Sequence, residues 1–234
     1  MVSQALRLGK GPLGAYIEWM TPENPTFPDP DEGLRDRLAD TVAANATFDG
    51  WTRTAIAHAA QGLGLPAGEA ERLFPGGPLG IVEYVSSRAD QRTVADMEAA
   101  GVAGMKVRDR IRTAVRIRLE KHAGERDAAR RALSLLALPL NAPLGLKLLY
   151  RTVDAMWYAA GDTSVDFNFY TKRATLAGVY SATLLYWLND RTEGGQGTWD
   201  FLDRRLDDVM RIEKIKSQVR AWPGARTRAG AARR

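Results

Sequence analysis

The chain has 234 residues, 45% hydrophobic and 26% charged, so it can bury one substantial core and has the ordinary composition of a globular protein. It contains no cysteine, which excludes disulfides, thiolate catalysis and cysteine-based zinc sites. The net charge of +5 is uneven, because residues 106–131 and 198–234 carry surpluses of six and five Lys/Arg over Asp/Glu. These basic zones favour phosphate-bearing partners such as lipid headgroups or nucleic acid. Solvated arginine-rich helix faces are an equally good explanation for residues 106–131.

Residues 1–33 hold five prolines and little periodicity, so they predict a mostly disordered leader, with Met20 as an alternative start to Met1. They show no apolar core of a signal peptide and no convincing mitochondrial leader. No apolar run along the chain approaches the roughly 18–20 residues that span a bilayer.

From residue 34 onward the pattern is helical and no segment sustains an alternation of period two, so the predicted fold class is all-α. Residues 34–90 have the rhythm of a helix-turn-helix of the TetR type. Its second helix, 66–74, carries Glu69 and Glu71 against Arg72 alone. Because glutamates repel DNA phosphates, DNA binding is not expected. A DNA-binding repressor that senses a hydrophobic ligand is the alternative hypothesis.

The pattern of residues 91–190 predicts further helices. This range contains the most informative segment of the chain, 156–173. This segment sets five aromatic residues around the polar elbow Gly161–Ser164. It contains no pair of nucleophile and base, which indicates a surface that binds rather than one that catalyses. Asp162 and Ser164 are interpreted as the cap of the long helix 166–187.

Motifs with catalytic chemistry are absent from the sequence. The chain has two histidines and no Glu-x-x-His, His-Glu-x-x-His, Gly-x-Ser-x-Gly or Walker pattern. No catalytic residue, metal ligand or cofactor is therefore expected. The rival hypothesis is an enzyme that uses the carboxylates of Asp154, Asp162 and Asp166.

The final helix is predicted over 198–222, with Thr198 as its N-cap, followed by a basic disordered tail, 223–234. Apolar residues recur along it every three or four positions in one stripe, which includes Trp199, Leu202, Leu206, Val209 and Trp222. Two interpretations stay open: a helix docked on the core or on a second subunit, and an amphipathic helix on an anionic membrane. The glycine-rich linker before it favours a tethered helix and hence the membrane.

Four motifs give the chain a resemblance to a known family. They are FDGW at 48–51, LFPGGP at 73–78, AMWYAAGDTSVDFNFYTKRATLAGVY at 155–180 and TWDFLDRRLDDVM at 198–210. With them the chain resembles the Coq-nine family of coenzyme Q biosynthesis proteins, which are TetR-like lipid-binding proteins of ubiquinone synthesis. The resemblance covers about residues 34–222.

The resemblance implies a homodimer that binds an isoprenoid quinone intermediate or another lipid and presents it to the di-iron demethoxyubiquinone hydroxylase. It implies a patch facing this partner, formed by Asp154, Trp157, Tyr158, Leu138 and Pro139. It also implies membrane contact through the final helix, at the cytoplasmic face of a bacterial inner membrane. In eukaryotic relatives the corresponding place is the matrix side of the mitochondrial inner membrane.

A carrier of a polyprenyl lipid needs an apolar cavity, because each buried CH₂ unit stabilises the bound state by roughly 0.8 kcal/mol. Aromatic and apolar residues along the helix 166–187 are candidates for its lining: Tyr170, Leu176, Tyr180, Leu184 and Trp187. The same pattern is equally typical of an ordinary helical core.

Overall fold

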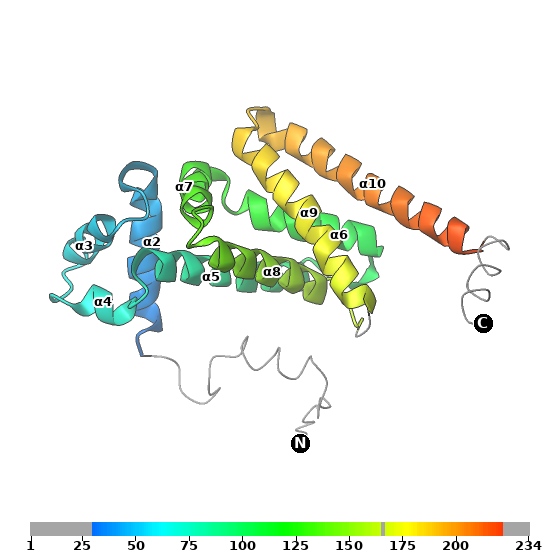
Figure 1. Cartoon of the computed structure of the whole chain (residues 1–234). Coiled ribbons are helices and arrows are strands. Elements are labelled where there is room, and N and C mark those ends of the chain that lie inside the picture. The colour runs from blue at the N-terminus through cyan, green and yellow to red at the C-terminus, as the bar shows by residue number, and fades with distance from the viewer. Residues whose placement is uncertain (1–29, 165–166, 222–234) are drawn as a thin grey trace, which may run out of the picture.

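A computed structural model describes the backbone of residues 30–164 and 167–221. In these ranges the chain forms nine α-helices and three short 3₁₀ turns and no strand, which confirms the predicted all-α class (Figure 1). The α-helices are α2 (Glu32–Asp49), α3 (Arg53–Gly62), α4 (Glu69–Leu73), α5 (Gly77–Ala99), α6 (Val107–Glu120), α7 (Arg126–Leu136), α8 (Ala142–Ala159), α9 (Phe167–Asn189) and α10 (Gln196–Ala221). The predicted leader and basic tail lie outside the described residues, apart from 30–33, where α2 already begins.

The N-terminal layer consists of α2, α3 and α4. Thr52 starts α3, because its hydroxyl accepts a hydrogen bond from the Ala55 amide at 3.0 Å. Trp51 is buried, and its indole Nε1 donates to the carbonyl of Ala128 at 2.9 Å. The Phe48–Trp51 motif therefore fixes this layer to α7.

The segment that resembles a recognition helix is short, since α4 has five residues. Its one arginine, Arg72, forms ion pairs with Asp31 at 2.6 Å and with Glu69 at 2.7 Å. An arginine engaged by two carboxylates offers little to a DNA phosphate. This geometry gives no support to the repressor alternative.

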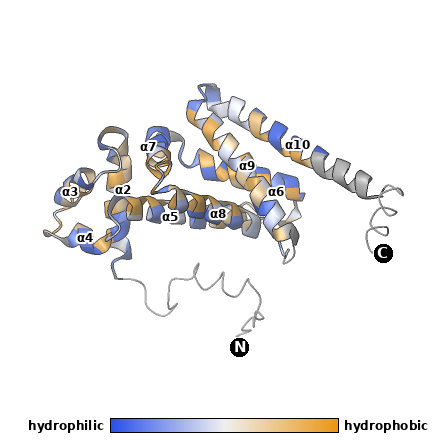
Figure 2. Ribbon diagram, viewed as in Figure 1, coloured by the Kyte–Doolittle hydropathy of each residue, from blue (hydrophilic) through white to orange (hydrophobic). Residues whose placement is uncertain are grey.

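Two apolar cores make up the interior. The N-terminal core joins α2–α5, α7 and the start of α8, and the C-terminal core joins α6, α9, α10 and the end of α8. Helices α5 and α8 pack side by side and run through both (Figure 1). Colouring by hydropathy shows α8 as largely apolar and α10 as mixed (Figure 2). Because α5 spans 77–99, the boundary predicted at residue 90 falls inside a helix.

The structure differs from the expectation of a tethered final helix. Trp199, Leu202 and Leu206 are buried in the C-terminal core, so the first half of α10 is docked against α9 and α6. Thr198 is not an N-cap, since the helix begins at Gln196. The amide and hydroxyl of Thr198 instead donate to Asp190 at 2.8 and 2.6 Å. Such a bonded turn is no loose linker, and the docked interpretation is the one that describes this structure.

Ion pairs reinforce the docking of α10. Arg108 binds Asp207 at 2.7 Å, and Arg112 binds Asp203 at 2.7 Å. The Arg116 guanidinium lies 4.8 Å from the ring centroid of Trp199. Much of the basic zone at 106–131 is therefore engaged within the molecule. In the described ranges no helix is both long and apolar enough to cross a membrane.

Candidate functional site

An apolar cavity of about 550 Å³ lies between the two cores. Its walls come from α2, α5, α6, α7, α8 and α9, and alanine and leucine side chains make up much of them. The volume falls within the range of roughly 300–1,000 Å³ that is common for small-molecule sites. The fold thus provides an internal space for an apolar ligand.

Three of the five residues predicted to bind lipid line this cavity: Tyr180, Leu184 and Trp187. They follow one another at helical spacing on one face of α9. Leu176 is 3% exposed and packs into the C-terminal core instead, while Tyr170 is 66% exposed near the start of α9. The structure therefore brings the last three together and separates Tyr170 from them; a role in lipid binding stays a prediction for all five.

The other walls of the cavity come from residues that were not predicted to bind lipid. Leu146 of α8 and Leu185 of α9 both line it, yet they are 69% and 59% exposed. These two leucines mark its rim between α8 and α9. A signal existed for the α7 wall, because Ala129, Leu133 and Leu136 recur at helical spacing.

One wall of the cavity is polar. Asp90 of α5 is 5% exposed and accepts hydrogen bonds from Arg118 Nε at 3.1 Å and from Thr152 Oγ1 at 2.9 Å. Arg118, Thr152 and Tyr180 all line the cavity. Burial raises the pKa of the Asp90 carboxyl, and the charge of Arg118 opposes that effect. Burial likewise raises the pKa of the Tyr180 hydroxyl, so this group is neutral at physiological pH.

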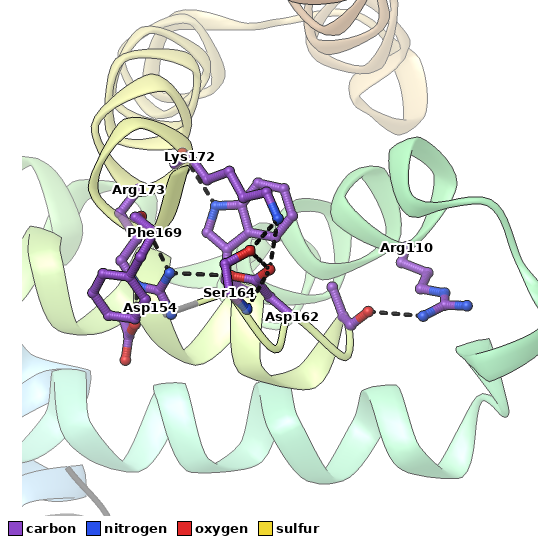
Figure 3. Close-up of polar contacts among 9 residues, drawn as sticks. Arg110, Asp154, Asp162, Ser164, Phe169, Lys172 and Arg173 are labelled. Atoms are coloured by element: carbon purple, nitrogen blue, oxygen red, sulfur yellow. Dashed lines mark hydrogen bonds and ion pairs between the residues drawn. The ribbon is translucent and has the colours of Figure 1, made fainter. Parts of the chain in front are cut away.

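A second polar cluster joins the end of α8 to the start of α9 (Figure 3). Arg173 of α9 binds Asp154 of α8 through Nε, and its Nη1 lies 3.2 Å from Asp162 Oδ2. Lys172 Nζ donates to Asp162 Oδ1 at 2.7 Å and to Ser164 Oγ at 2.6 Å. Four charged side chains from two helices and their connection thus bind one another.

The two carboxyl groups of this cluster have opposite pKa shifts. Burial raises the pKa of Asp154 more than Arg173 lowers it. At Asp162 burial acts in the same direction, but the combined hydrogen bonds from Lys172, Ser164 and Arg173 prevail and lower the pKa. Asp162 is therefore bound as a carboxylate between two cations.

This arrangement gives Asp162 and Ser164 contacts in addition to the predicted helix cap, which stays a prediction because residues 165 and 166, directly before α9, lie outside the described residues. The carboxylate of Asp162 binds Lys172 and Arg173 side chains, in the second turn of α9, and so it fastens the elbow onto the helix. Asp166, the third carboxylate of the enzyme hypothesis, lies outside the described residues. Among the described residues no group of three or more His, Asp or Glu is placed to hold a metal ion.

The predicted partner-facing patch is not one surface in this structure. Asp154 is 1% exposed and bound to Arg173, so the prediction that it lies on the surface is wrong and the residue is internal. Tyr158 is 50% exposed at the end of α8, whereas Leu138, 52% exposed, and Pro139 precede its start. An 18-residue helix is about 27 Å long, so these groups lie at opposite ends.

Trp157 lies between these extremes, since it is half-buried and packed against α9. Its indole Nε1 donates to the carbonyl of Lys172 at 3.2 Å, and Lys172 Nζ lies 5.4 Å from its ring centroid. Near it, Phe169 and Tyr170 contact each other edge to face with centroids 5.2 Å apart. Among the described side chains at this end of the molecule, Tyr158 and Tyr170 are large, exposed aromatic residues.

Comparison with solved structures defines the class of protein. The TetR transcriptional regulator from Nitrosomonas europaea ATCC 19718 has this fold, with a TM-score of 0.62 and 23% identity; the match covers 75% of this chain and 97% of that chain. The protein is therefore all-α and TetR-like in its fold.

Sequence comparison defines the family more narrowly. The family model described as COQ9 matches residues 142–213, which span α8, α9 and much of α10. The Rattus norvegicus protein named "Ubiquinone biosynthesis protein COQ9, mitochondrial" is 36% identical over 82% of this chain and 63% of its own length. The Xenopus laevis COQ9-B protein is 31% identical over 81% of this chain and 67% of its own. The chain belongs to the COQ9 family.

The match also has a limit. The chain spans 63% of the rat relative and 62% of the relatives from Bos taurus and Homo sapiens. The fold and the family follow from these comparisons, and the activity requires an argument from the site.

Proposed function

We propose that this protein is a lipid-binding accessory protein of ubiquinone biosynthesis that presents a polyprenylated quinone intermediate to a hydroxylase. The observation that carries the proposal is the apolar cavity of about 550 Å³ lined by six helices. Relatives that match most of the chain bear the name ubiquinone biosynthesis protein, which supplies the pathway.

The physical case for a carrier rests on the tail of the ligand. A polyprenyl chain is insoluble in water, and each CH₂ unit that enters an apolar wall gains about 0.8 kcal/mol. The alanine- and leucine-rich walls on α7 and α8 offer such an environment. The rim at Leu146 and Leu185 offers a path for a tail longer than the cavity.

The chemistry is assigned to the partner and not to this chain. Asp162 of the elbow and Asp154 of α8 are both bound by Arg173. Carboxylates held in this way stabilise the fold and are poor general bases. The proposed partner is the demethoxyubiquinone hydroxylase, with Trp157 and Tyr158 as the contact at the elbow.

Membrane contact in this proposal involves α10. Its residues Trp199, Leu202 and Leu206 are buried in the docked helix, and Val209 is partly buried. Contact through these side chains requires the helix to leave α6 and α9; Trp222 lies outside the described residues. The proposal places a homodimer peripherally on the anionic cytoplasmic face of a bacterial inner membrane.

The test is the lipid content of the protein purified from its native membrane, measured by extraction and mass spectrometry. The account predicts a bound quinone-like lipid in the wild type. Ala132→Phe fills the cavity and is expected to remove the lipid, while Ala174→Phe, at an exposed position of α9, keeps it. Wild-type protein that carries no lipid would overturn the proposal.

A further inference from the structure

The guanidinium of Arg118 is bound on one side only. Its Nε donates to Asp90 at 3.1 Å, and within the described part of the chain its two Nη groups make no hydrogen bond. The side chain is 12% exposed and lines the cavity. These Nη groups are not among the fully buried unpaired atoms of the described residues, so they open onto the cavity, where this edge of Arg118 can donate to an oxygen atom.

Tyr180 offers a second polar group on the same wall. It is 5% exposed, lines the cavity, and its hydroxyl forms no hydrogen bond with any other described residue. Arg118 and Asp90 are near enough to act on it electrostatically. A phenol in this position can both donate and accept a hydrogen bond.

The charge of this wall restricts what it can hold. Arg118 is paired with Asp90, and Thr152 donates to the same carboxylate at 2.9 Å, so the positive charge is already balanced. A phosphate or carboxylate placed here would bring an uncompensated negative charge into an apolar cavity, which is unfavourable. A neutral group with oxygen acceptors meets no such penalty.

We infer that Arg118 and Tyr180 form a head-group site for a neutral ring bearing oxygen substituents, with the apolar tail of the same ligand along α7 and α8. Arg118 donates from Nη to a carbonyl, hydroxyl or methoxy oxygen of the ring, and the Tyr180 hydroxyl binds a second oxygen. Asp90 and Thr152 are positioning residues that hold the guanidinium in place. This inference rests on the proposed function and adds the orientation of the ligand and the residues that bind its head group.

The test compares three ligands that share a ten-carbon tail and differ in the head group. Decylubiquinone has a neutral oxygenated ring, decylbenzene has a ring without oxygen, and decyl phosphate has an anionic head. Their affinities are measured on the full chain by displacement of the neutral fluorescent probe N-phenyl-1-naphthylamine. The variants are Tyr180→Phe, which removes one oxygen atom, and Arg118→Lys, which keeps the charge and removes the fork. Tyr150→Phe, at an exposed tyrosine outside the cavity, is the matched control.

We expect the wild type to bind decylubiquinone more tightly than the other two ligands. Each cavity variant is expected to weaken decylubiquinone about five- to tenfold, the size of one lost hydrogen bond, and to leave decylbenzene unchanged. Tyr150→Phe is expected to match the wild type for every ligand. Tyr180→Phe adds no volume, so it keeps the test valid if Arg118→Lys fails to fold.

Different failures separate the two proposals. If the cavity variants lose the same affinity for decylubiquinone and for decylbenzene, or lose none, the head-group site is overturned. The protein would still be a lipid carrier. Tighter binding of decyl phosphate than of decylubiquinone overturns the neutral head group. No displacement by any of the three ligands overturns the carrier itself.

Discussion

Two buried arginine–aspartate pairs on the same bundle differ in how completely they are bound. Arg173 contacts Asp154 and Asp162, donates to the Phe169 carbonyl at 3.3 Å, and covers the Phe169 ring at 3.3 Å from its centroid. Arg118 has one carboxylate partner, and its remaining donors face a cavity. The arginine of the first pair binds protein groups through both Nε and Nη1, whereas that of the second pair binds through Nε alone and has both Nη groups left for a ligand.

This difference indicates two roles for buried ion pairs, one in stabilising the fold and one in binding a ligand. A buried ion pair contributes little net stability, yet removing one partner is expensive because the other charge remains. Substitution in the Arg173 pair, which binds only protein groups, should therefore lower the stability of the fold. Substitution in the Arg118 pair, which has Nη donors facing the cavity, should instead lower the affinity for a ligand. The following predictions test this difference.

The largest effect is expected at Arg173. The variant Arg173→Met leaves Asp154 buried without its cation and should lower the free energy of unfolding by about 3–5 kcal/mol. Urea denaturation followed by circular dichroism measures this change. Arg37→Met, at an exposed position of α2, is the control and should stay close to the wild type. A loss below about 1 kcal/mol at Arg173 would show that the elbow cluster is not structural.

Asp190 adds a buried carboxylate that is bound by neutral donors instead of an arginine. Burial favours its neutral form, but four hydrogen bonds from Thr192 and Thr198 outweigh burial and lower the pKa to about 2. Asp190→Asn should cost on the order of 2 kcal/mol at neutral pH, with loosening of α10.

The pH dependence follows from the lowered pKa of Asp190. Its contribution is fully present above the unfolded value near pH 4 and is lost as the pH falls toward 2. The stability difference between wild type and Asp190→Asn should therefore shrink over this interval in denaturation experiments. A difference that stays constant from pH 7 to pH 2 would contradict the assignment.

A smaller effect is expected for the exposed ion pairs between α6 and α10. Asp207 is paired with Arg108 at 2.7 Å and is half-exposed, so Asp207→Asn should cost about 0.2–1 kcal/mol. Hydrogen exchange of α10 amides at low and high salt measures it, because salt screens exposed pairs. Equal protection at both salt concentrations would assign the docking to Trp199 and Leu202 alone.

The smallest effect on stability is expected at Tyr180. Tyr180→Phe removes a hydroxyl that has no partner among the described residues, so the unfolding free energy should change by less than about 0.5 kcal/mol. Urea denaturation of the unliganded protein checks this value. A loss above about 1.5 kcal/mol would mean that the hydroxyl serves the fold and would weaken its assignment to a ligand.

Much of the fold could be predicted from the sequence, because helical periodicity and strong breakers are local signals. Pro75 and Gly76 lie between α4 and α5, and the aromatic segment leads into α9. The docking of α10 could not be predicted, since one apolar stripe serves a membrane and a core equally well. The choice depends on partners far along the chain, such as Arg108 and Arg112.

The candidate site was predictable only on the α9 face. Tyr180, Leu184 and Trp187 share that face by helical spacing, so the sequence could group them. Arg118 is one of five arginines on α6, and nothing in the local pattern separates it from the others. Its role follows from Asp90, which lies 28 residues away and reaches it only after α5 and α6 have packed together.

The most direct test of the two roles is the thermal stabilisation that decylubiquinone gives to Arg118→Lys and to Arg173→Lys. The account predicts that Arg173→Lys has a lowered Tm but keeps a ligand-induced increase comparable to that of the wild type. Arg118→Lys should keep a Tm close to the wild type and lose most of that increase. An equal ligand-induced increase in Tm in the two variants, or the reverse pattern, would contradict the distinction between the structural Arg173 pair and the Arg118 pair that faces the cavity.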